Sequence, residues 1–185
     1  MARGEPIVPD VARLLWAPEA STRRAAAELL GRVGGAQAAE QLAQLLENDE
    51  LETGTRAATL YALGQAGSHP DVAVEELPVS LVEAHLDDPD AYVRAAAVVC
   101  LLRIGGAPRR LATQALIDDE DEWVHIAGLR ALAELASSAD RPLRDTLVSG
   151  MARITEASAQ TSLLVALAKI IDPPQADDQL IVGPA

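Results

Sequence analysis

The residue types that most often do chemistry are few in this chain and stand apart from one another. The histidines are His69, His85 and His125, and the single cysteine is Cys100. Metal sites and activated nucleophiles need such side chains at short, defined spacings or beside a partner base, and no pair of these four has that spacing. Cys100 stands in an alanine- and leucine-rich run, where a buried and unreactive thiol is expected. We therefore predict no catalytic residue, no metal site, no cofactor, and a protein that is not an enzyme.

Acidic residues are the next candidates, because several carboxylates together can bind a hard cation such as Ca²⁺. Two runs, Asp87–Asp90 and Asp118–Glu122, contain eight carboxylates between them. Neither run has the glycine hinge or the spacing of an EF-hand loop. Acids just before a helix also cap its free N–H groups and complement its dipole. We interpret both runs as helix caps.

The elements that would position these residues follow from an internal repeat. The segment 86–106, LDDPDAYVRAAAVVCLLRIGG, matches the chain 71 positions earlier. The earlier members of the matched pairs are Leu15, Pro18, Arg23, Arg32 and Gly34–Gly35; the later ones are Leu86, Pro89, Arg94, Arg103 and Gly105–Gly106. Self-similarity at a fixed distance is typical of proteins built from stacked repeats.

An acidic turn, then Val-Arg, then an alanine- and leucine-rich helix ending at Gly-Gly resembles the second helix of a HEAT repeat. The resemblance implies an all-α fold, an α-solenoid of about five antiparallel helix pairs in a right-handed stack, with the second helices on the concave side. We place the repeat domain at 1–171 and a C-terminal tail at 172–185. The repeats lie at about 7–35, 36–68, 71–106, 107–137 and 140–171, and Pro78 is expected to kink or split a helix in the third.

The HEAT resemblance also assigns a role to one column of aligned positions. Arg23, Arg56, Arg94 and His125 are separated by 33, 38 and 31 residues. In HEAT-like proteins an arginine here contacts an acidic residue or a turn carbonyl in the neighbouring repeat, so we expect a structural ladder. His125 is expected to make a local hydrogen bond instead. Arg109, at the start of an outer helix, is expected to be exposed.

A second set of positions is predicted to bind a partner. Helical spacing assigns one stripe of the helix 91–104 to the core and leaves Tyr92, Val99 and Arg103 facing away from it. Aligned positions in the flanking repeats carry further aromatic and arginine residues, which are enriched at binding hot spots. The alternative is that the rings cover the acidic turns and pack over adjacent repeats. The predicted partner-binding residues are Tyr61, Tyr92, Arg103, Trp123 and Arg130.

Composition limits the classes of partner. The chain has 28 acidic and 15 basic residues, a net charge of −13, which disfavours nucleic acid and anionic membranes. No apolar run is long enough to span a bilayer, and the first residues have no apolar core of signal-peptide length. Together with a single cysteine this predicts a cytoplasmic protein.

We predict a non-catalytic protein–protein interaction scaffold or adaptor that binds a helix or extended peptide of another protein on its concave helix face. The alternative is a lyase or enzyme accessory subunit that handles a tetrapyrrole or a partner enzyme, because HEAT-like repeats occur in phycobilin lyases. A third class, the HEAT-like alkylpurine DNA glycosylases, needs a basic groove, which this sequence does not offer. The partner's identity and the oligomeric state stay open.

Overall fold

The computed structural model describes residues 7–171, and its secondary structure within that range is entirely helical. The first helices of the successive repeats are α1 (Ile7–Leu14), α3 (Ala36–Leu46), α5 (Val79–Glu83), α7 (Gly106–Asp118) and α9 (Arg144–Gly150). The second helices are α2 (Ala20–Val33), α4 (Thr53–Gly67), α6 (Ala91–Ile104), α8 (Glu122–Leu135) and α10 (Ala157–Ile171). Short 3₁₀ helices occur at η1 (Val74–Glu76), η2 (Ala84–Asp87), η3 (Ser138–Leu143) and η4 (Met151–Arg153).

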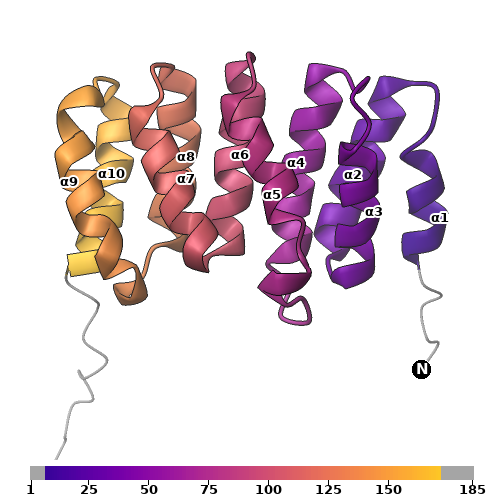
Figure 1. Cartoon of the computed structure of the whole chain (residues 1–185), viewed down its shortest axis with the longest axis horizontal. Coiled ribbons are helices and arrows are strands. Elements are labelled where there is room, and N and C mark those ends of the chain that lie inside the picture. Colours follow the sequence, from indigo (N-terminus) through magenta and orange to yellow (C-terminus); the bar gives the residue numbers. More distant parts are fainter. Residues whose placement is uncertain (1–6, 172–185) are drawn as a thin grey trace, which may run out of the picture.

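The helices form two layers that run along the long axis of the molecule (Figure 1). The second helices pack on one another in the order α2, α4, α6, α8, α10, and each also packs on the first helix of its own repeat. Helices α1 and α10 therefore lie at opposite ends of the array. One apolar cluster continues through the whole stack, because each repeat buries its surface only against its neighbours. This arrangement confirms the predicted α-solenoid of helix pairs.

Small residues allow the second helices to cross at close range. A Cβ atom on Gly64 of α4 would lie 2.8 Å from the Cα of Cys100 on α6, and one on Gly31 of α2 would lie 2.8 Å from the Cα of Ala62. A larger residue at either glycine would fit only if the backbones of the two packed helices moved apart. The repeats also end as expected: Gly34 and Gly105, which follow α2 and α6, have φ values of 72° and 85°. Such positive values favour glycine.

The third repeat departs from the regular pattern in its first helix. Pro78 immediately precedes α5, which has only five residues, and η1 and η2 lie on either side. Pro78 therefore splits the helix rather than kinking it, because proline has no N–H to continue the hydrogen-bond ladder.

The second helix of this repeat is more buried than its sequence pattern predicts. Val99 is 4% exposed, and residues 95–102 of α6 are all buried. The expectation that Val99 faces away from the core is wrong. The reason is the close packing of α6 between α4 and α8, its neighbours in the same layer; α5, η2 and α7 also contact α6. A helix with neighbours on three sides is apolar around most of its circumference.

No helix within residues 7–171 is long and apolar enough to cross a membrane. The tail predicted at 172–185 lies outside the described residues.

Candidate functional site

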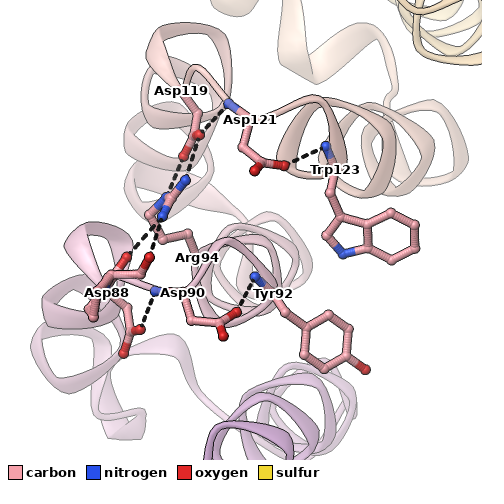
Figure 2. A network of polar contacts seen from close by, with 8 residues as sticks. Asp88, Asp90, Tyr92, Arg94, Asp119, Asp121 and Trp123 are labelled. Atoms are coloured by element: carbon pink, nitrogen blue, oxygen red, sulfur yellow. Dashed lines mark hydrogen bonds and ion pairs between the residues drawn. The ribbon is translucent and has the colours of Figure 1, made fainter.

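The acidic turns before α6 and α8 have the same geometry (Figure 2). The Asp90 carboxylate caps α6 by accepting a hydrogen bond from the backbone N–H of Tyr92 at 2.8 Å. One repeat later, the Asp121 carboxylate caps α8 by accepting from the N–H of Trp123, also at 2.8 Å. Each cap satisfies a free N–H group of the first turn, as proposed from the sequence. Because each cap bonds the N–H of an aromatic residue, both rings leave their helices at equivalent points.

Arg94 lies on the other side of the same turns and joins the third repeat to the fourth (Figure 2). Its Nε and Nη2 donate to the two Asp119 carboxylate oxygens at 2.7 and 3.0 Å. Nη1 donates to the backbone oxygens of Asp88 at 3.0 Å and Pro89 at 3.4 Å. The planar guanidinium is suited to this because its donors form a rigid fork. Burial would raise the pKa of Asp119, but the Arg94 hydrogen bond, the Asp121 N–H and nearby positive charge outweigh it and lower that pKa.

Equivalent contacts join the earlier repeats. Arg23 donates to the backbone oxygens of its own turn at 2.7 Å and pairs with Glu52, the residue before α4 in the second repeat. Arg56 donates to the backbone oxygen of Asp49 at 3.0 Å and lies 3.4 Å from the Asp88 carboxylate in the third. Each of these arginines therefore contacts its own turn and an acidic residue of the next repeat.

His125 differs from the arginines at this position. It is 5% exposed, and its Nε2 has no hydrogen-bond partner within residues 7–171. The expected local hydrogen bond is therefore missing at Nε2. In the fifth repeat the own-turn contact returns, since Gln160 Nε2 donates to the backbone oxygen of Ile154 at 2.8 Å.

Sequence reasoning missed Gln160, although a signal was present. Gln160 follows the capping residue Glu156 by four positions, as Arg94 follows Asp90. Counting from the cap, instead of searching for Val-Arg, would have located the position in every repeat.

Arg109 is a second residue that sequence reasoning placed wrongly. Its side chain is only 15% exposed, and its Nη1 donates to both Asp140 carboxylate oxygens at 2.9 and 3.0 Å. Its Nε donates to the backbone oxygen of Leu102 at 2.9 Å. Asp140 also accepts from the backbone N–H of Ser137 within a capping box at η3. Arg109 is therefore mostly buried and joins the fourth repeat to the fifth.

The three aromatic residues of the predicted partner-binding set form a continuous row across α4, α6 and α8. The ring centroids of Tyr61 and Tyr92 are 6.3 Å apart, and those of Tyr92 and Trp123 are 6.5 Å apart. Such spacings are typical of interacting aromatic pairs. Tyr92 is 43% exposed and Trp123 48%, while Tyr61 is half-buried. The Tyr92 and Trp123 rings are thus not sealed beneath neighbouring turns. We call Tyr61, Tyr92 and Trp123 the aromatic row.

The two arginines of the set occupy different environments. Arg103 is half-buried on α6, and its Cδ would lie 3.4 Å from a Cβ on Gly64, one turn after Tyr61 on α4. Arg103 therefore borders the aromatic row. Arg130 stands exposed on α8, where its Nε is 3.8 Å from the Glu134 carboxylate of the same helix.

A shallow hollow adjoins the row at Tyr61. Its volume is about 240 Å³, and α2, α4 and α6 all contribute to it. The lining residues are Glu28, Arg32, Ala58, Tyr61, Ala62, Gln65 and Tyr92. Burial raises the pKa of Tyr61 to about 12, with the Tyr92 hydroxyl adding to the effect and Arg103 opposing it. The Tyr61 hydroxyl therefore keeps its proton at neutral pH and can donate a hydrogen bond.

The residue types associated with catalysis and metal binding are used differently. Cys100 is fully buried, and burial raises the pKa of its thiol to about 12, so no thiolate forms at neutral pH. Within residues 7–171 no group of three or more His, Cys, Asp or Glu side chains is arranged to hold a metal ion.

Comparison with known proteins agrees with the fold. A family model described as HEAT repeats matches residues 7–101, slightly more than half of the chain. The chain belongs to the HEAT-repeat family. The match ends within α6, while the structure continues the same helix pairing to residue 171.

Two similar proteins can be named. A protein of Pseudanabaena tenuis (strain PCC 7409), described as "Uncharacterized phycocyanin operon protein Z", is 29% identical over 156 residues that cover 76% of each chain. The crystal structure of an engineered protein matches with a TM-score of 0.60 and 22% identity, covering 90% of this HEAT-repeat chain and 80% of the other. The second likeness supports the fold alone.

Proposed function

We propose that this HEAT-repeat protein is a non-catalytic scaffold that binds a segment of another protein across the second-helix face. By second-helix face we mean the exposed surface of α2, α4, α6, α8 and α10 that bears the aromatic row. The observation that carries this proposal is the row itself. Three rings from three consecutive repeats lie in contact, and two of them are nearly half exposed.

Tyr92 and Trp123 expose apolar ring surface, whereas Tyr61 is partly packed against the core. The core consists of alanine, valine, leucine and isoleucine, with no phenylalanine anywhere in the chain. Exposed aromatic rings that touch one another form a rigid apolar surface, and such surfaces are enriched at protein–protein hot spots. A helix or an extended peptide laid across α4, α6 and α8 would cover all three rings at once.

The test is capture of a partner from the native host by the full chain, followed by affinity measurement with the purified partner. Trp123→Ala or Tyr92→Ala should weaken binding by about 2 kcal/mol, roughly thirtyfold, as hot-spot truncation does. Trp16→Ala is the matched control, because Trp16 is 56% exposed and is not part of the row. Unchanged binding by Trp123→Ala would show that the partner docks elsewhere.

The relative from the phycocyanin operon favours a second candidate function. The chain would then handle a tetrapyrrole or assist an enzyme that does, with the flat rings stacking on the pigment and arginine pairing with its carboxylates. Incubation with a bilin tests this directly. A shift in the pigment's absorbance that Trp123→Ala abolishes would support it, and an unchanged spectrum would remove it.

A further inference from the structure

Within residues 7–171 Arg103 has no counter-ion, although the protein has a net charge of −13. It shares this lack of an ion pair with Arg24, Arg32, Arg110, Arg141 and Arg144, but it also borders the aromatic row. Its Nε is buried and has no hydrogen-bond partner within the same range. A buried donor left unpaired is destabilising, so such a group in a native structure calls for an explanation.

Arg103 differs from Arg94 and Arg109, although the Nε of Arg23 is also buried and unpaired within residues 7–171. Arg94 and Arg109 each donate to a carboxylate and to backbone oxygens, so their guanidinium groups are used inside the protein. Arg103 lies on the opposite edge of α6 from Arg94, beside the aromatic row. Arg103 is half-buried, and because its Nε is buried, the donors left for a group that comes from outside are Nη1 and Nη2, which make no hydrogen bond within residues 7–171.

The surroundings of Arg103 restrict that group. Gly64 has no side chain, and the Arg103 stem lies against it, so the guanidinium is held near α4. Tyr61 stands one turn before Gly64 on the same face of α4, and i, i+3 residues are neighbours on a helix. The positive charge of Arg103 is also near enough to oppose the rise in the Tyr61 pKa, so the protonated Tyr61 hydroxyl is a second donor in the surroundings of Arg103. A fork of N–H donors with an O–H donor beside it is complementary to a carboxylate.

Resting on the proposed function, we infer that Arg103 and Tyr61 receive an Asp or Glu carboxylate of the partner protein, while an apolar side chain of the same segment covers Tyr92 and Trp123. The argument for this occupant is charge complementarity. The overall charge of the protein repels anionic chains at long range, so the partner segment carries its acid locally, next to an apolar anchor, and is not acidic throughout.

This chemistry can be tested without knowing the partner. The probe is a displayed library of random 16-residue peptides, selected on the full chain at physiological salt and counter-selected on Trp123→Ala. Long-range attraction to an acidic protein alone would enrich Lys- and Arg-rich peptides. The inference instead expects enriched peptides with an apolar residue and an Asp or Glu at a fixed spacing from it.

A double-mutant cycle then assigns the contact. For an enriched peptide, Glu→Gln in the peptide and Arg103→Gln in the protein should each weaken binding about tenfold or more, the scale of a charge-assisted hydrogen bond. The two changes together should cost little more than either alone. Arg103→Lys should recover only part of the loss, because lysine lacks the fork. Arg110→Gln is the control, an exposed arginine of α7 on the other layer, and should bind as wild type does.

The outcomes separate this inference from the proposed function. Enriched peptides that depend on Trp123 but carry no acid, or that bind Arg103→Gln unchanged, would overturn the carboxylate assignment and leave the scaffold function standing. A library with no Trp123-dependent peptides would overturn both. Binding of a bilin, but of no peptide, in an Arg103-dependent way would also overturn the commitment to a protein carboxylate.

Discussion

Arg94 offers the sharpest test of how the repeats are held together. The Arg94→Ala substitution removes two hydrogen bonds to the Asp119 carboxylate and the contacts to the backbone oxygens of Asp88 and Pro89. Asp119 keeps one partner, the backbone N–H of Asp121 at 2.9 Å. A charge-assisted bidentate pair contributes about 1.5–3 kcal/mol, and the partly buried carboxylate left behind adds to the loss. We expect the free energy of unfolding to fall by about 3 kcal/mol.

The measurement is urea denaturation followed by circular dichroism at 222 nm, with Arg110→Ala as the control. Arg110 is exposed, and its removal should change stability by about 0.5 kcal/mol or less. Arg94→Lys should fall between the two, because it keeps the charge but not the two-pronged contact. Equal midpoints for Arg94→Ala and Arg110→Ala would refute the reasoning.

The same pair makes a prediction about pH. The pKa of folded Asp119 is lowered, so its contribution to stability is fully present above the unfolded value and is lost as pH falls through the folded one. In Arg94→Ala the guanidinium that lowers this pKa is gone, and its contribution to stability goes with it. The stability difference between wild type and Arg94→Ala should therefore be constant near neutral pH and shrink below about pH 4, near the ordinary pKa of aspartate. A difference that stays constant down to pH 2 would show that Asp119 is not the group involved.

Three further outcomes follow from the same geometry. Arg109→Ala should lower stability by about 2–3 kcal/mol in the same urea assay, because it removes the hydrogen bonds to the Asp140 carboxylate and the Leu102 carbonyl. A loss below about 0.5 kcal/mol would contradict the internal position of Arg109. Gly64→Ala should lower stability by about 1–3 kcal/mol, because its Cβ would meet the backbone of Cys100 at 2.8 Å, and an unchanged midpoint would show that the crossing relaxes freely. The Cys100 thiol, fully buried and with its pKa raised to about 12, should react with a thiol reagent only in denaturant; rapid labelling of the native protein would contradict this.

The fold could be predicted from the sequence because its contacts are local and the same unit repeats along the chain. A solenoid repeat buries its apolar face only against the next repeat, so a pattern that recurs along the chain describes the whole array. The helix caps followed for the same reason, since Asp90 and Asp121 act on N–H groups two residues away. Tyr92 and Trp123, placed just after these caps, could likewise be assigned to equivalent positions from their spacing alone.

Two of the places where sequence reasoning failed depend on neighbours that are remote along the chain. Val99 is buried where α6 packs between α4 and α8, which helical spacing within α6 does not reveal. Arg109 is internal because Asp140, 31 residues later, reaches it. Gln160 takes the ladder position in the fifth repeat although its side chain is not the expected one.

The sequence by itself therefore determined the fold class, the repeat order, the caps and the residues of the candidate face. Only the tertiary structure decided how those residues meet. It placed the three rings in one row, joined the repeats through Arg94 and Arg109, and left the Arg103 Nε without a hydrogen-bond partner within residues 7–171. The physical reason is range: propensity, capping and periodicity act over a few residues, whereas burial and ion pairing depend on which surfaces the stack brings together.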